Sequence, residues 1–416
     1  MVRKTAYEIL KQVIMQNAYG NLALKAMPKS MSQADRSLVT QIVYGTLQKY
    51  DYLCWQWQHY LEKPCSLRYE ILINLSIYQL MFLDRVPAYA VVNEALNCLP
   101  SHQRSFVQAI LTRFIEKGIR VVDIEDSLQR CAIENAIPLW ILKLWQAQYG
   151  EESMQKIAHA SSCDFGQMVG RINPLLADLK QMKQDQKLHF IDEWAIEYEG
   201  NLLETNYFNL GQIVIQDYAS QQVAKLVDPK PGMRVLDACS APGTKCSMMA
   251  AMMENQGEIL ACDLHEHRLE LIRQGMAKLN VHNVTVQQLD ATQAHLCFER
   301  ESFDCLLLDV PCSGLGTLRH KPDLKFHIQP EDLDALILTQ KAILDSCSGL
   351  VKVGGVLVYS TCTLNRKEND KQIDGFLKQH SEYELIESQT CFPFERNQDG
   401  FYMAKLVKKE SSSVVK

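Results

Sequence analysis

The sequence lacks any apolar run long enough to cross a bilayer, and it has no strong excess of charge of either sign. Its 43 Lys and Arg stand against 49 Asp and Glu, and its 47% apolar and 22% charged content is that of an ordinary globular protein. The first residues, Met1–Thr5, lack the apolar core of a signal peptide. We therefore expect a cytoplasmic protein without a membrane segment. A net charge of −6 gives no global argument for nucleic-acid binding, although a local basic patch suffices for phosphate contacts.

Several common cofactor and metal motifs are also missing. None of the 14 cysteines lies in a Cys-x-x-Cys pair, and their spacing is not that of a zinc module, so we expect no metal site. In a reducing cytosol most of these cysteines are expected to be small buried apolar residues. The sequence has neither the Gly-x-Gly-x-x-Gly loop of dinucleotide-binding proteins nor a Walker A loop.

A chain of 416 residues is too long for one compact core, so we expect two or three domains. Residues 1–115 are predicted to be all-helical, because apolar residues recur there at helical spacing and prolines separate helices of ordinary length. The aromatic stretch Tyr50–Tyr60 is interpreted as core packing rather than as a stacking surface. Residues 116–165 continue helical. The segments Met168–Asn173 and Trp194–Tyr198 favour strands, which predicts a small α/β subdomain.

From about residue 216 the pattern becomes strand, loop and helix in alternation. Such alternation predicts a mostly parallel, doubly wound α/β sheet covered by helices on both faces. We expect strands at Arg234–Ala238, Glu258–Asp263, Val284–Leu289, Phe303–Asp309 and Gly355–Thr361, and helices at Cys246–Met253, Glu266–Leu279 and within Asp332–Asp345.

One loop and two acidic side chains stand at the ends of three successive strands of this predicted sheet. A tight loop follows the first strand, at the position where open α/β sheets bind nucleotide-like cofactors. Asp263 ends the second strand, where a carboxylate can accept both ribose hydroxyls, and Asp290 follows the third, where it can accept from an adenine amino group. This arrangement favours S-adenosylmethionine, although each acid taken alone could be a helix cap. The loop consists of Cys239, Ser240, Ala241, Pro242, Gly243, Thr244 and Lys245.

Two cysteines and an aspartate stand at the ends of two further strands. The apolar run from Phe303 ends at Asp309, and Cys312 follows it among prolines and glycines that prevent further regular structure. Cys362 closes the run that begins at Val356. A thiolate can add to C6 of a pyrimidine and so activate C5 for methylation, while a carboxyl such as Asp309 assists at N3. A second thiol is useful in releasing the adduct. The alternative is that both cysteines are buried and inert.

Specific motifs resemble the Sun/NOP2 family of RNA 5-methylcytosine methyltransferases over about residues 165–408. That resemblance implies an S-adenosylmethionine-dependent enzyme whose nucleophile is Cys362, whose release-assisting thiol is Cys312 and whose Asp309 lies between cofactor and base. It also implies that the loop 239–245 takes the methionine portion, Asp263 the ribose and Asp290 the adenine, and that Lys245 and Arg171 line the site. The motifs are Arg171-Ile-Asn-Pro174, Gln216-Asp-Tyr-Ala-Ser220, Asp237-Ala-Cys-Ser-Ala-Pro-Gly-Thr-Lys245, Asp309-Val-Pro-Cys-Ser-Gly314, Tyr359-Ser-Thr-Cys362 and Asp399-Gly-Phe-Tyr-Met403.

Two alternatives remain at this point. DNA 5-methylcytosine methyltransferases attack from a Pro-Cys dipeptide, and Pro311-Cys312 is one, so Cys312 is the alternative nucleophile. The family's loop usually reads Ala-Pro-Gly-Gly-Lys-Thr, whereas Thr244 and Cys246 depart from it here. Thr244 adds a Cβ where a glycine would allow either a close approach of the backbone to the ligand or a positive φ. A cofactor site that has decayed would leave an RNA-binding assembly factor.

The amino-terminal segment resembles the domain of the transcription-antitermination factor NusB, which implies a helical RNA-binding module. The full resemblance implies that the protein acts on 16S ribosomal RNA or on a small-subunit assembly intermediate, and we expect a monomer. We predict a NusB-like domain over residues 1–125, linker helices and a small subdomain over 126–215, and the catalytic domain over 216–410. A basic cluster at Arg319-His-Lys321 and Lys325 is a candidate for phosphate contacts. The NusB-like motifs are Tyr44-Gly-Thr46, Tyr78-Gln-Leu80, Val86–Asn93 and Phe106–Arg113.

Overall fold

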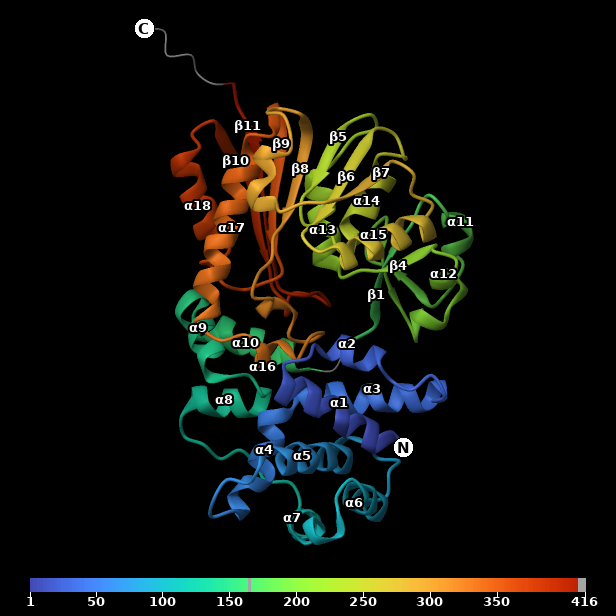
Figure 1. The fold of residues 1–416 in the computed structure, drawn as a ribbon, viewed down its shortest axis with the longest axis vertical. Helices are drawn as coiled ribbons and strands as arrows, with labels where there is room; N and C mark the ends of the chain where they lie inside the picture. Colours follow the sequence, from blue (N-terminus) through green and yellow to red (C-terminus); the bar gives the residue numbers. More distant parts are fainter. Residues whose placement is uncertain (164–165, 411–416) are drawn as a thin grey trace. The chain divides into compact units, whose positions relative to one another are not determined.

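The structure is a computed structural model that describes residues 1–163 and 166–410. The chain divides into two compact units (Figure 1). The helical unit comprises Met1–Cys163 and Leu318–Gln329, and the sheet unit comprises Asp164–Thr317 and Pro330–Lys416. Among the described residues, no helix combines the length and the apolar character that a membrane span requires.

The helical unit is all-α, as predicted from the spacing of its apolar residues. Buried residues between Val2 and Phe114 share one core cluster, which includes Leu10, Val43, Trp57 and Leu72. Trp57, in the aromatic stretch, is fully buried and donates from Nε1 to Asn74 Oδ1 at 2.8 Å, so core packing is confirmed for this residue. The α-helices are α1 (Val2–Gln16), α2 (Gly20–Lys25), α3 (Gln33–Gln48), α4 (Tyr50–Trp57), α5 (Leu67–Phe82), α6 (Ala88–Asn97), α7 (Arg104–Lys117), α8 (Ser127–Asn135), α9 (Leu139–Tyr149), α10 (Glu151–Ser162) and α16 (Leu324–His327).

A segment far along the sequence, Leu318–Gln329, belongs to the helical unit. Lys325 Nζ donates to the backbone carbonyls of Gln48 at 3.1 Å and Ala136 at 2.6 Å. Asp323 Oδ2 accepts from the backbone N–H of Gly20 at 2.9 Å. Because the Lys325 side chain is buried and bound to carbonyls, its assignment to a phosphate-binding cluster is wrong.

The sheet unit begins with a small four-stranded antiparallel sheet in the order β2-β3-β1-β4. Its apolar residues form a separate small core with Met182 and Leu202 from the connecting segments. The elements are β1 (Met168–Ile172), α11 (Leu179–Met182), β2 (Leu188–Phe190), β3 (Ala195–Tyr198), α12 (Asn206–Asn209) and β4 (Ile213–Ile215).

A seven-stranded sheet of order β10-β11-β9-β8-β5-β6-β7 dominates the unit and confirms the predicted doubly wound fold. Strands β5 to β9 run parallel, and β11 pairs antiparallel to both β9 and β10. Figure 1 shows α13, α14 and α15 on one face and α17 and α18 on the other, matching two separate core clusters. The elements are α13 (Tyr218–Val227), β5 (Arg234–Asp237), α14 (Thr244–Met252), β6 (Glu258–Asp263), α15 (Glu266–Lys278), β7 (Val284–Gln288), β8 (Phe303–Asp309), α17 (Asp332–Ser348), β9 (Val351–Thr361), α18 (Asp370–Gln379), β10 (Tyr383–Cys391) and β11 (Phe401–Lys408).

The order of the strands places the ligand-binding edge. Sequence order runs outward from β5 to β6 and β7 on one side, and from β8 to β9 on the other. The direction of winding therefore reverses between β5 and β8, and ligands of doubly wound sheets bind beyond the carboxyl ends of the strands at such a point. Asp237, Asp263 and Asp309 are the last residues of β5, β6 and β8, so all three lie at this edge.

Candidate active site

The two strand-end cysteines meet. Cys312 follows β8 by three residues and Cys362 follows β9 directly, and the parallel register pairs Asp309 with Ser360. Because these neighbouring strands end at the same level, the Sγ atoms of Cys312 and Cys362 lie 3.4 Å apart, within hydrogen-bonding distance for sulfur. This bond, followed by burial and the charge of Glu368, raises the pKa of Cys312 well above its usual range. Cys312 is therefore held as a thiol that can donate to Cys362.

An ion pair stands beside these thiols. Lys245 Nζ lies 2.8 Å from Asp309 Oδ2, and Ser360 Oγ donates to Asp309 Oδ1 at 2.8 Å. Burial alone would lower the pKa of Lys245, but Asp309, and then Cys362, outweigh it and raise the pKa above its ordinary value. The ammonium of Lys245 is thus paired with a carboxylate and also interacts with the charge of Cys362.

The loop after β5 is held by its own backbone. Ser240 N–H donates to Cys262 O of the neighbouring strand, and Gly243 N–H closes back onto Ser240 O, each at 2.7 Å. Gly243 has a φ of 96° and caps α14. A Cβ there would also lie 3.0 Å from Met276 Cε, so glycine is required at this position.

The two departures of this loop from the family pattern have local explanations. Thr244 is the first residue of α14 and is not among the residues with positive φ, so the expectation of backbone strain at Thr244 is wrong. The left-handed conformation falls on Gly243 instead. Cys246 is fully buried in the core beneath the sheet, where it packs with Val235 and Ile259. It is a packing residue.

Asp237, which ends β5, is a site residue that sequence reasoning did not single out. It is buried, and among the described residues neither of its carboxylate oxygens has a hydrogen bond of normal geometry. Burial raises the pKa of Asp237 to about 7, although the nearby Ser240 hydroxyl acts in the opposite direction. The available signal was its position, because it ends its strand as Asp263 and Asp309 end theirs.

Asp263 ends β6 and Asp290 follows the neighbouring strand β7 by two residues, but the two have different surroundings. Asp263 is buried, accepts from His265 N–H at 3.2 Å, and lies 3.3 Å from Arg268 Nη1. Asp290 accepts from the N–H and hydroxyl of Thr292 at 3.0 and 2.6 Å, both through Oδ1. Asp290 is therefore also the cap of a short 3-10 helix, Ala291–Leu296. The capping interpretation holds for this residue without excluding a ligand at its other oxygen.

Comparison with known proteins decides the family. A family model described as 16S rRNA methyltransferase RsmB/F matches residues 224–407, and the NusB family model matches residues 1–116. A relative from Bacillus subtilis (strain 168), described as probable ribosomal RNA small subunit methyltransferase B, is 36% identical over 400 residues, which cover 92% of this chain and 89% of the relative. The chain belongs to the ribosomal RNA small subunit methyltransferase B family. Both resemblances seen in the sequence are thereby confirmed.

Solved structures agree with this fold. A methyltransferase homologue from Pyrococcus horikoshii is 25% identical, with a TM-score of 0.60 over 69% of this chain and 100% of its own. NSun6 from Pyrococcus horikoshii, solved with SFG, is 20% identical, with a TM-score of 0.61 over 66% of this chain and 99% of its own. The second likeness supports the fold alone.

Arg171 lies in the interior rather than on an open surface. Its side chain is fully buried; Nε donates to Gln216 Oε1 and Nη2 to Ser247 Oγ, each at 2.8 Å. Burial lowers the pKa of Arg171 to about 9. Because Ser247 belongs to α14, Arg171 forms a hydrogen bond with the helix that follows the loop.

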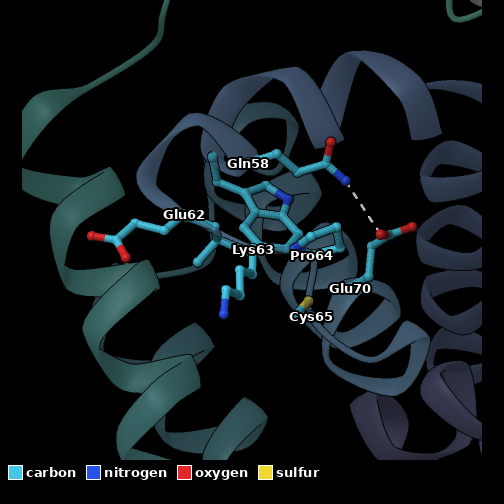
Figure 2. Close-up of a pocket in the computed structure, with 8 residues that line it drawn as sticks. Gln58, Glu62, Lys63, Pro64, Cys65 and Glu70 are labelled. Carbon is cyan, nitrogen blue, oxygen red and sulfur yellow. Dashed lines mark hydrogen bonds between the residues drawn. The ribbon is translucent and has the colours of Figure 1, made fainter.

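A pocket of about 240 Å³ in the helical unit has a different character (Figure 2). Glu62, Lys63, Cys65 and Glu70 line it with apolar neighbours, and Gln58 donates to Glu70 at 3.2 Å. Among the described residues, no group of three or more His, Cys, Asp or Glu is arranged to hold a metal ion.

Proposed function

We propose that this rRNA methyltransferase methylates C5 of a cytidine in 16S ribosomal RNA, with S-adenosylmethionine as donor and through a covalent bond between Cys362 and C6. The observation that carries the proposal is the 3.4 Å contact between Cys312 and Cys362 beside the Lys245–Asp309 pair. Cytosine C5 is not nucleophilic until a nucleophile adds to C6, and a cysteine thiolate is suited to that addition. A methyltransferase acting on oxygen or on an exocyclic amine would need neither thiol.

The two thiols receive different roles from their surroundings. Cys312 is held protonated, so it can donate a hydrogen bond to Cys362 and favour the thiolate there. The Lys245 ammonium also favours negative charge on Cys362. We therefore assign Cys362 as the nucleophile and Cys312 as the residue that assists release of the adduct.

The proton movements follow from these positions. When the Cys362 thiolate adds to C6, negative charge develops on the ring and is relieved by a donor at N3. The Lys245–Asp309 pair supplies that donor. After C5 has accepted the methyl group, its proton is removed by a base of the site, the C6–S bond breaks, and Cys362 leaves as a thiolate.

The residues at the strand ends fit the methyl donor. Bound S-adenosylmethionine supplies an electrophilic methyl group. The loop 239–245 would hold its methionine portion, Asp263 its ribose and Asp290 its adenine. The fit is supported by the buried carboxylate oxygens of Asp237, left without a hydrogen-bonding partner beside this loop among the described residues.

Covalent trapping tests the assignment of the thiols. RNA that carries 5-fluorocytidine blocks the proton loss at C5, so the adduct persists and can be seen on a denaturing gel. We expect Cys362→Ala to abolish trapping and methylation, and Cys312→Ala to retain trapping. The reverse pattern would make Cys312 the nucleophile, and absence of an adduct in every variant would refute the covalent mechanism.

Calorimetric titration with S-adenosylmethionine tests the cofactor separately. We expect the wild-type chain to bind, and Asp263→Ala to bind at least tenfold more weakly, the loss that about 1.4 kcal/mol of ribose contacts produces. A wild-type chain that does not bind, with RNA present or absent, would instead support an assembly factor that has lost methylation.

A further inference from the structure

A buried carboxylate outside the aspartates of the sheet edge joins the two cysteine loops. Glu368 lies between β9 and α18 and is fully buried. Its carboxylate accepts from Ser313 N–H at 2.9 Å, Ser313 Oγ at 2.5 Å, Gln340 Nε2 at 2.9 Å and Asn365 Nδ2 at 3.0 Å. All four donors are neutral groups, so this carboxylate is buried without one of the cations that usually accompany such a charge.

The donors come from the segments that carry the thiols. Ser313 directly follows Cys312, and Asn365 comes three residues after Cys362. A hydrogen bond of 2.7 Å between Ser313 Oγ and Thr363 Oγ1 links the same two loops. A hydrogen-bond network centred on Glu368 therefore holds together the two loops whose sulfur atoms are in contact.

Helix α17 completes the network. Gln340 Nε2 donates to the carbonyl of Pro311 at 3.0 Å as well as to Glu368, so α17 holds both sides of Cys312. Gln372 of α18 in turn donates to Gln340 Oε1 at 3.3 Å. Removing Glu368 would leave several buried donors unsatisfied at the base of the Cys312 loop, which favours movement of that loop.

The charge of Glu368 also acts on the site. It contributes to the raised pKa of Cys312, after the hydrogen bond that Cys312 donates to Cys362, burial and the charge of Cys362. Titratable groups that interact with the two thiols also include Tyr359, whose pKa is raised by burial and then by the charge of Cys312, and the ammonium of Lys245. Glu368 is thus a carboxylate whose charge acts on Cys312 and whose hydrogen bonds reach Ser313, the next residue of the chain.

We propose that Glu368 is a positioning residue that holds the Cys312 loop against the Cys362 loop so that Cys312 can release the adduct formed on Cys362. This inference rests on the proposed function and adds a residue to it. Glu368 itself touches neither thiol by a hydrogen bond in the structure; its carboxylate acts through Ser313 and Asn365.

The test is Glu368→Gln, assayed with RNA that carries an ordinary cytidine. The amide keeps the size of the carboxylate but cannot accept all four hydrogen bonds. We expect the covalent RNA–protein complex to accumulate, because adduct formation continues while its release slows by at least about tenfold. This factor is smaller than the rate acceleration that a general acid or base typically contributes. Cys312→Ala should show the same accumulation, and Glu368→Asp should restore part of the release rate.

A matched control separates positioning from general loss of structure. Asp304 lies on the same strand as Asp309 but near its other end, where it pairs with Lys352 at 2.7 Å, so Asp304→Asn removes a carboxylate without touching the cysteine loops. We expect Asp304→Asn to release its adduct at the wild-type rate. S-adenosylmethionine titration of Glu368→Gln should give the wild-type affinity.

Two results would overturn the inference. One is release by Glu368→Gln at the wild-type rate. The other is simultaneous loss of adduct formation and cofactor binding in Glu368→Gln that is not shared by Ser313→Ala. Ser313→Ala is the milder variant, because it removes the hydroxyl hydrogen bond to Glu368 and keeps the one from the Ser313 N–H. Failure of the proposed function looks different, since neither the wild-type chain nor Cys312→Ala would then form an adduct.

Discussion

Two buried lysines, one in each unit, show how differently the same side chain can be used. Lys245 in the sheet unit and Lys325 in the helical unit are 9% and 8% exposed. Lys245 pairs with the carboxylate of Asp309 at 2.8 Å, whereas Lys325 donates to the carbonyls of Gln48 and Ala136. The pKa of Lys245 is raised, while burial lowers that of Lys325 to about 8.

The difference lies in the partner. Gln48 is the last residue of α3 and Ala136 caps the end of α8, so both carbonyls lack a partner within their own helices. Lys325 satisfies these helix ends, and its role is structural. A carboxylate, by contrast, compensates the full charge of Lys245 and keeps a proton next to Cys362. A buried lysine is therefore a catalytic candidate when its partner is an ionised group at a ligand-binding edge.

Removal of the carboxylate partner should have the largest effect. Asp309→Asn leaves the Lys245 ammonium buried with only a neutral amide beside it. We expect methyl transfer in a single turnover to fall at least about a hundredfold, because the pKa of Lys245 falls without its ionised partner and the proton that Lys245 donates at N3 is no longer held there. The free energy of unfolding in urea should fall by about 2 kcal/mol, less than for a fully buried pair because Asp309 is partly exposed.

Ser360→Ala is the control for Asp309→Asn. It removes the other hydrogen bond to Asp309 at Oδ1 but leaves the ion pair in place. Its loss of methyl transfer should be no more than about tenfold. Equal losses in the two variants would show that the orientation of Asp309, and not the charge pair, matters.

The free energy of unfolding should depend on pH through Lys325. Lys325 has a pKa of about 8 when folded and an ordinary value of 10.5 when unfolded, so between these values the unfolded chain binds more protons. Stability attributable to Lys325 therefore rises with pH from about 8 to 10.5, by up to roughly 3 kcal/mol, and is lowest below pH 8, where the buried lysine is charged. Lys325→Met should lack this rise when urea unfolding of the full chain is followed across that range.

Lys321→Met is the matched control, because Lys321 belongs to the same segment but is exposed. It should follow the wild-type pH dependence. A rise with pH that persists unchanged in Lys325→Met would mean that another group is responsible, and Lys325 would then not be a buried cation.

The comparison of Lys245 with Lys325 shows which parts of the structure could be predicted from the sequence. Strands β5 to β8 and the acids at their ends were predictable because apolar runs bounded by glycine and proline are local signals. The same signals placed Cys312 and Cys362 at one edge. The burial of Lys325 was not predictable, since it depends on Gln48, 277 residues away. Glu368 was missed for the same reason, because its donors come from three separate segments.

Strand β10 and the start of strand β9 could not be predicted from local sequence patterns either. Strand β10 is largely exposed between Tyr383 and Cys391, so it lacks the apolar alternation of a half-buried strand, as edge strands often do. Strand β9 begins at Val351, five residues before the apolar run at Val356, because Gly354 and Gly355 are accommodated within the strand where its register with β8 shifts. Glycines in a sequence otherwise indicate a break.

The smallest expected effect concerns the start of the helix that carries Lys245. Thr244 occupies the first position of α14 with no positive φ, so Thr244→Gly removes no strain and should lower the free energy of unfolding by about 0.5 kcal/mol through greater backbone freedom. The affinity for S-adenosylmethionine, measured by calorimetric titration, should then stay within about threefold of wild type. Gly243→Ala is the contrasting variant, because its φ of 96° and the 3.0 Å approach to Met276 make a Cβ costly there. Tighter binding by Thr244→Gly, by tenfold or more, would contradict this account and show that the threonine side chain obstructs the ligand.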